Sequence, residues 1–136
     1  MGISTKELRI GNLVEYDGLH CEVKLIEESG LAVMFEDGEE IWIDIWQFCP
    51  ISITEKWLLK FGFEKVPKKD YMTLFLSEDD ENEFSRQRVD FWFGDKDFQA
   101  AELCRSGVCF KRVKMSYVHQ LQNLYYFLMG KELSYE

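Results

Sequence analysis

A β-hairpin is the expectation for residues 31–46, which read LAVMFEDGEEIWIDIW. Its turn signal is Asp37-Gly38, because both residue types tolerate the positive φ of a tight type I′ turn. The same kind of signal occurs twice upstream, at Asp17-Gly18 and Ser29-Gly30. Three such turns between short apolar runs predict a meander of four or five short antiparallel strands. A unit this small has to protect its edges by curling into a barrel or by docking on another element.

The two tryptophans of this stretch lie on the side opposite its isoleucines if residues 40–46 form one strand. Ile41, Ile43 and Ile45 can then fill a core. Trp42 and Trp46 share the other face with acidic side chains. Two interpretations stay open. Either both rings pack beneath the second half of the chain, or they anchor a protein partner, as tryptophan does at many interfaces.

Helical periodicity replaces the strand pattern from about residue 53. Thr54 is a suitable N-cap, and Gly62 can end the helix in a left-handed conformation. Trp57 and Phe61 share one face of this helix. We therefore expect both aromatic side chains to be buried between the helix and a sheet.

The rest of the chain predicts further strands and one more helix. Alternation indicates four strand segments, at residues 71–77, 88–94, 98–104 and 108–115. In the second of them, one face carries Val89, Phe91 and Phe93, and the other carries Arg88, Asp90 and Trp92. The last two segments resemble a hairpin, although residues 99–102 could also be helical.

Ser116 can cap a last helix that stops at Gly130. Tyr126 and Phe127 widen the apolar arc of this helix beyond the roughly 100° that a surface helix needs. The first half of the chain is expected to cover the extra surface, or a homodimer forms there.

Charge is unevenly distributed along the chain. Residues 1–53 carry 3 basic and 11 acidic side chains, whereas residues 54–136 carry 13 and 14. The net charge of −9 disfavours nonspecific nucleic-acid binding and acidic membranes, and no apolar run is long enough to span a bilayer. A basic segment that also contains aromatic side chains keeps nucleic-acid binding as the alternative function. Its basic residues are Arg105, Lys111, Arg112 and Lys114.

The cysteines and histidines show no catalytic or metal-binding motif. Cys104 and Cys109 form one loose pair, whereas zinc sites usually present two closely spaced pairs. Cys21 and Cys49 lie far apart in apolar contexts. Without a secretory signal, we expect reduced, mostly buried thiols in a cytoplasmic protein. No catalytic residue, metal ligand or cofactor is expected, because the two histidines belong to no known catalytic or metal-binding motif.

Two resemblances add to these patterns. Residues 31–43 (LAVMFEDGEEIWI) resemble the middle of a Tudor or KOW-type SH3-like barrel, and residues 10–16 (IGNLVEY) resemble its opening strand. Tudor domains bind methylated Arg or Lys in an aromatic cage, and the matching positions here are Tyr16, Phe35 and Asp37. Alternation directs Phe35 inward. KOW-type barrels contact RNA or protein, and the acidity of this half favours protein.

The wider resemblance rests on three motifs that occur in order. They are residues 7–14 (ELRIGNLV), 53–63 (ITEKWLLKFGF) and 118–125 (VHQLQNLY). Together they are similar to a family of small uncharacterised proteins of Bacteroides-type gut bacteria, their phages and mobile elements. This resemblance implies a context and no mechanism.

The expected fold is therefore α+β with two modules. Residues 1–52 form a small SH3-like β-barrel or meander. Residues 53–136 form a helix, a four-stranded antiparallel sheet and a C-terminal helix, and the modules are expected to share one core. The expected function is a non-catalytic, cytoplasmic protein-binding or adaptor module with a protein partner.

Overall fold

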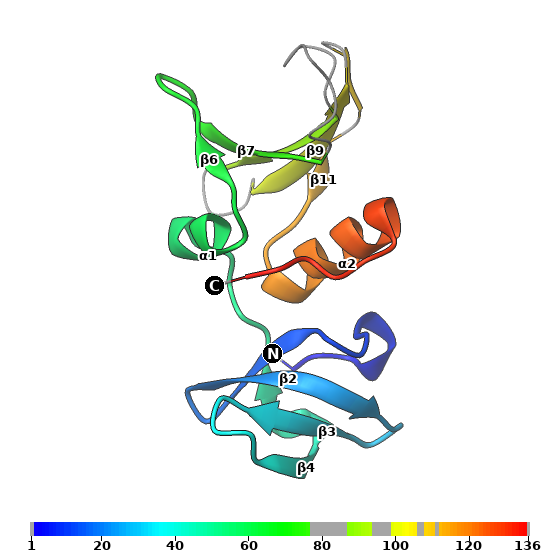
Figure 1. Ribbon diagram of the computed structural model, residues 1–136. Helices are drawn as coiled ribbons and strands as arrows, with labels where there is room; N and C mark the ends of the chain where they lie inside the picture. The colour runs from blue at the N-terminus through cyan, green and yellow to red at the C-terminus, as the bar shows by residue number, and fades with distance from the viewer. Residues whose placement is uncertain (1, 77–86, 94–98, 106–107, 111, 136) are drawn as a thin grey trace. The chain divides into compact units, whose positions relative to one another are not determined.

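The structure is a computed structural model that describes residues 2–76, 87–93, 99–105, 108–110 and 112–135 (Figure 1). It is an α+β fold with two antiparallel sheets and two α-helices. The chain divides into two compact units. The first comprises Met1–Ile53 and Tyr117–Leu133, and the second comprises Thr54–Ser116 and Ser134–Glu136. This division differs from the predicted one, which placed the last helix in the second module.

The first unit contains a five-stranded meander, as the turn signals predicted. Its strands are β1 (Leu13–Tyr16), β2 (Leu19–Ile26), β3 (Gly30–Phe35), β4 (Glu40–Asp44) and β5 (Phe48–Cys49), in the order β4-β3-β2-β1-β5. Short 3-10 helices cover Thr5–Glu7 and Ile45–Gln47. Asp17 and Gly18 both have positive φ, at 48° and 78°, as a tight hairpin between β1 and β2 requires.

Alternating side chains of the meander build the core of the first unit. The buried cluster consists of Ile3, Leu8, Val14, Cys21, Val23, Leu31, Val33, Ile43 and Phe48. Of the three isoleucines expected in this core, Ile43 is buried and Ile45 is partly buried against the cluster. Ile41 is 40% exposed, because it lies near the open end of the edge strand β4. The predicted strand over residues 40–46 is also too long, since β4 ends at Asp44.

Helix α2 (Val118–Met129) belongs to the first unit through buried amide side chains. Gln122 Oε1 accepts a hydrogen bond from the Leu13 backbone N–H at 2.8 Å, and its Nε2 donates to the Gly11 carbonyl at 3.3 Å. Asn12 Nδ2 donates to Asn123 Oδ1 at 2.8 Å. The helix therefore completes the hydrogen bonding of the chain around β1. An apolar stripe alone does not reveal this role.

The second unit contains a six-stranded sheet. Its strands are β6 (Glu64–Lys65), β7 (Tyr71–Phe75), β8 (Arg88–Trp92), β9 (Ala100–Arg105), β10 (Val108–Cys109) and β11 (Val113–Lys114). The order is β10-β9-β8-β7-β6, and β11 also pairs with β9. The strand predicted over residues 108–115 is divided, because β10 and β11 pair with different parts of β9. The acidic segment 78–83 lies outside the described residues.

Helix α1 (Glu55–Lys60) follows its predicted caps closely. Thr54 Oγ1 accepts a hydrogen bond from the Trp57 N–H at 3.3 Å, and Gly62 adopts a φ of 94° just after the helix. Trp57 and Phe61 are both buried, as predicted, with their ring centroids 5.7 Å apart. Tyr135 approaches both rings edge-on.

Candidate functional site

The two tryptophans singled out in the sequence lie on β4 and on the 3-10 helix that follows it. Trp42 is 44% exposed on β4, and Trp46 is 75% exposed on the 3-10 helix that follows. Neither ring is buried. Trp46 does not continue the alternation of β4, since that strand ends two residues earlier.

Apolar and acidic side chains surround Trp42 on its face of the sheet. The register pairs Trp42 with Ala32, and Met34 with Glu40 and Glu22, so these side chains share one side of the sheet. Leu25 pairs with Ala32 and is exposed. We call this set the tryptophan surface. It comprises Trp42, Leu25, Ala32 and Met34 on one side of the sheet, with Glu22, Glu40 and Asp44 beside them, and Trp46 on the adjoining 3-10 helix.

Gly30 creates the space in which the Trp42 ring lies. Its backbone φ is not positive, so the turn predicted at Ser29-Gly30 does not explain this glycine. Instead Gly30 starts β3 opposite Asp44. A Cβ at this position would collide with the Trp42 ring and lie 2.6 Å from the Ile43 carbonyl oxygen. The glycine therefore lets the Trp42 ring approach the backbone of β3 closely.

We expect Gly30→Ala to lower the free energy of unfolding by about 1–3 kcal/mol, the usual cost of forcing extra atoms into a packed site. It should also change tryptophan emission, because the Trp42 ring has to move. Chemical denaturation followed by fluorescence measures both effects. Ser29→Ala, at the exposed neighbouring position, is the control. An unchanged unfolding midpoint for Gly30→Ala would contradict the close seating of Trp42.

Tyr16 and Asp37 do not form the cage that the Tudor resemblance implies. The Tyr16 ring contacts Phe35 and Phe48, with centroids 6.2 and 6.0 Å away, on the side of the sheet that faces the core. Asp37 Oδ1 accepts the Glu39 N–H at 2.9 Å and thus stabilises its own turn. Phe35 and Asp37 do line a shared pocket of about 380 Å³ beside Leu19 and His20. Tyr16 is not among the residues that line it.

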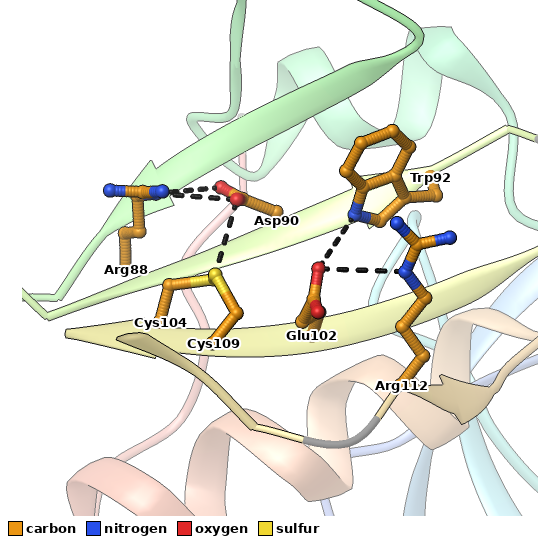
Figure 2. The surroundings of a disulfide bond; sticks show 7 residues. All are labelled: Arg88, Asp90, Trp92, Glu102, Cys104, Cys109 and Arg112. Atoms are coloured by element: carbon orange, nitrogen blue, oxygen red, sulfur yellow. Dashed lines mark hydrogen bonds and ion pairs between the residues drawn. A yellow bond between two sulfur atoms is a disulfide. The ribbon is translucent and has the colours of Figure 1, made fainter. Parts of the chain in front are cut away.

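A second candidate site lies on the polar face of the sheet in the second unit. Arg88, Asp90 and Trp92 point to this face, as alternation along β8 predicted (Figure 2). Asp90 is only 2% exposed, and both of its carboxylate oxygens contact Arg88 Nε, at 3.1 and 3.2 Å. The Asp90 carboxylate is also close to a sulfur atom, because Cys104 Sγ lies 3.5 Å from Asp90 Oδ2.

Glu102 joins this cluster through its contacts with Trp92 and Arg112. Trp92 Nε1 donates to Glu102 Oε2 at 3.0 Å, and Arg112 Nε lies 3.6 Å from the same oxygen. The Arg112 guanidinium also stacks over the Trp92 ring at 4.1 Å. Of the basic segment proposed for nucleic acid, Arg112 is therefore already engaged within its own unit. Arg105 and Lys114 are exposed, and Lys111 lies outside the described residues.

Cys104 and Cys109 form a disulfide, so the prediction that all four cysteines are reduced thiols is wrong for this pair. The register of β9 and β10 places the two residues directly opposite each other, with both side chains on one face. Cys109 is exposed because β10 is an edge strand. Cys21 is a buried free thiol, as predicted, and burial raises its pKa to about 11. Cys49 is free but exposed, contrary to the expectation.

His119 is a buried histidine on α2 in the first unit. Its ring stacks on Tyr117, with centroids 5.9 Å apart, and Nε2 lies 3.3 Å from Glu7 Oε1. Neither ring nitrogen has a hydrogen bond of good geometry among the described residues. Burial lowers the pKa of His119 below its ordinary value of 6.5, and the nearby Glu7 carboxylate opposes part of this change.

This lowered pKa predicts a loss of stability on acidification. Below pH 6.5 the unfolded chain protonates His119 while the folded protein still holds it neutral, so falling pH favours unfolding. We expect the unfolding free energy to decrease as the pH falls from 6.5 towards the lower pKa of the folded state. His119→Gln should flatten this slope, whereas His20→Gln serves as the control. A slope that His119→Gln leaves unchanged would assign the effect to carboxylates instead.

Sequence reasoning missed Asp90, Glu102 and the disulfide as parts of one site. Alternation correctly placed Asp90 on the polar face, but its surroundings also include Cys104 of the neighbouring strand β9, besides Arg88 two residues earlier on β8. Pairing the two predicted strands in the correct register would have revealed the site, because β9 sets Glu102 opposite Asp90 of β8.

Among the described residues, neither helix has the length and apolar character needed to cross a membrane. Comparisons of the chain with protein-family models, curated proteins and solved structures found no match.

Proposed function

We propose that this chain is a non-catalytic binding or adaptor protein that engages a protein partner through the tryptophan surface. We also propose that the first unit has an SH3-like fold. The five-stranded antiparallel meander with a 3-10 helix before its last strand supports that assignment. The cytoplasmic location and the context in phages or mobile elements of Bacteroides-type bacteria stay predictions.

The exposure of Trp46 is the observation that carries this proposal. Three quarters of this side chain is open to water on an ordered 3-10 helix, close in sequence to the half-exposed Trp42. Covering apolar surface gains about 25 cal/mol per Å², so a partner that buries the ring gains substantially. Tryptophan is also enriched among the few residues that dominate binding energy at interfaces.

The charge around the surface indicates what kind of partner fits. Residues 1–53 carry a net charge of −8, and residues 117–133 add one Lys and one Glu. Glu40 and Asp44 lie on the same face as Trp42, as does Glu22, which forms an ion pair with Lys24. Complementary potentials steer association and select partners. The partner is therefore a protein segment that combines apolar side chains with Lys or Arg.

Peptide binding tests this function directly. The probes are immobilised peptides in which Lys or Arg flank Leu and Phe, and matched peptides that carry Glu at the basic positions. The wild-type protein should retain the basic set selectively, and Trp46→Ala should weaken binding at least about tenfold, as loss of a central anchor does. The matched control is Phe127→Ala, which removes an exposed aromatic ring from α2. Equal losses for both variants, or a preference for the acidic set, would contradict the proposal.

A second copy of the chain is the competing occupant of this surface. Sedimentation at micromolar concentration distinguishes it from another protein, because a dimer that Trp46→Ala dissociates would identify the partner as the chain itself. A single species near 16.2 kDa at low and high salt would exclude the homodimer.

Nucleic-acid binding is the second candidate, and exposed Phe110 is the observation in its favour. This ring is 57% exposed in the segment that also presents Arg105 and Lys114. Bases stack on such rings while basic side chains contact phosphate. Single-stranded DNA and RNA of mixed sequence are the probes, titrated with salt. Binding that weakens steeply with salt and with Phe110→Ala would support this function, whereas weak, salt-insensitive binding would remove it.

A further inference from the structure

Four side chains with metal-binding atoms converge on the polar face of the second sheet (Figure 2). They are Asp90, Glu102, Cys104 and Cys109, and one ligand atom from each lies within 4.8 Å of all the others. The two sulfur atoms are bonded to each other, so neither is a thiolate in this state. We propose that reduction of this disulfide opens a Zn²⁺ site made of two thiolates and two carboxylates. The predicted absence of zinc would then hold for the disulfide form alone.

The dimensions of the cluster suit a tetrahedral ion. Zinc binds thiolate sulfur at about 2.3 Å and carboxylate oxygen at about 2.0–2.2 Å, which places neighbouring ligand atoms roughly 3.4–3.8 Å apart. A cluster within 4.8 Å therefore needs only small side-chain adjustments. The sulfur atoms have to separate once the bond is cleaved. Cys109 can make this movement, because it is exposed on a two-residue edge strand.

Two arginines balance the charge of such a site. Two thiolates, two carboxylates and Zn²⁺ sum to −2, and Arg88 and Arg112 contribute +2. Arg88 contacts Asp90, while Arg112 lies beside Glu102. A carboxylate has about four acceptor positions, so each can keep its arginine and still bind a metal. Contacts of this kind orient ligands around bound metals and raise affinity.

The hydroxyl group of Thr73 is an independent indication that a polar group is missing from this face of the sheet. Its side chain is 6% exposed, and its hydroxyl has no hydrogen-bond partner among the described residues. The register pairs Thr73 with Asp90, so the hydroxyl lies on the face that carries the cluster. Buried polar groups in native proteins are nearly always satisfied. Rearrangement around a bound ion would bring a ligand oxygen towards this hydroxyl.

The chemistry balances with a thiol as the reductant. Two equivalents of a small thiol, or one dithiol, transfer two electrons and two protons to the Cys104–Cys109 bond and leave as a disulfide. The two protein thiols then lose their protons to solvent as Zn²⁺ binds. Soft thiolates disfavour Mg²⁺ and Ca²⁺, and the two hard carboxylates disfavour Cu(I), so zinc suits the mixed ligand set best.

Metal titration of the full chain, with and without reduction, tests the site. Protein reduced by a phosphine and freed of it without air is titrated with Zn²⁺, and in parallel with Co²⁺. We expect about one ion per chain in the reduced protein, with thiolate-to-cobalt charge-transfer bands and the strong visible absorption of four-coordinate cobalt. The melting temperature of the reduced protein should rise with Zn²⁺, whereas that of the oxidised protein should not.

Single substitutions assign the ligands. Cys109→Ser should weaken Zn²⁺ binding at least about 100-fold, and Glu102→Gln should weaken it roughly 10–100-fold, as loss of supporting contacts already does at known sites. Glu102 is the preferred carboxylate to change, because Asp90→Asn leaves the partly buried Arg88 unpaired and can unfold the unit. Cys49→Ser is the matched control, since it removes an exposed thiol elsewhere. Equal zinc binding by reduced and oxidised protein, or unchanged affinity in Cys109→Ser, would overturn the proposal.

Discussion

Trp57→Ala should lower the free energy of unfolding by about 3–5 kcal/mol, the range for truncating a large buried aromatic side chain. Trp57 is buried on α1, where its ring packs against Phe61 and Tyr135. The Lys60 ammonium group also lies 4.8 Å from the ring centroid. The substitution therefore leaves a cavity and removes several ring contacts at once. Urea denaturation followed by circular dichroism measures the change.

Leu59→Ala is the matched control for Trp57→Ala. Leu59 lies on the same helix but is half exposed, and alanine favours helix as much as leucine does. We expect its effect to stay below about 1 kcal/mol. Equal stability of Trp57→Ala and the wild type would refute the burial of this ring.

Gln122→Leu should lower the free energy of unfolding by about 2–6 kcal/mol, because one buried and one part-buried backbone group lose their partners at about 1–3 kcal/mol each. The Leu13 N–H and the Gly11 carbonyl both bind the Gln122 amide. Leucine has a similar size and is apolar, so the loss reports hydrogen bonding more than packing. Hydrogen exchange adds a local measurement, since the Leu13 amide should exchange faster in the variant.

Phe127→Ala controls for a general weakening of α2. Phe127 is exposed on the same helix and contributes little to its packing. We expect its stability to remain within about 0.5 kcal/mol of the wild type. Unchanged protection of the Leu13 amide in Gln122→Leu would show that this side chain does not hold β1.

Local signals made much of the fold predictable. Asp17-Gly18 forms a tight turn because both residues adopt positive φ. Such a turn depends on residues that are adjacent in the sequence, so it can be predicted from them. Thr54 and Gly62 delimited α1 for a similar reason, since capping uses hydrogen bonds within one turn of the helix. Period-two alternation likewise separated the faces of β8.

Features that depend on distant residues were not predictable in the same way. Gln122 looked like an ordinary polar position on a helix, yet it is buried because it binds the chain more than a hundred residues earlier. Asp90 and Glu102 became neighbours only through the pairing of β8 with β9. The disulfide required the register of a hairpin whose sequence could also be read as helix near residues 99–102. Trp42 and Trp46 were found from composition and alternation, although their exposure was left open.

The interrupted first unit has a consequence for synthesis on the ribosome. Residues 1–53 emerge first, but Tyr117–Leu133 completes their unit only after the whole intervening segment has been made. Until then, the nascent meander lacks the helix whose Gln122 side chain accepts a hydrogen bond from the Leu13 N–H. The inserted segment can meanwhile collapse around its own sheet, as domains generally fold as units. Cotranslational folding is therefore expected to run against chain order, with the part that is translated first becoming stable last.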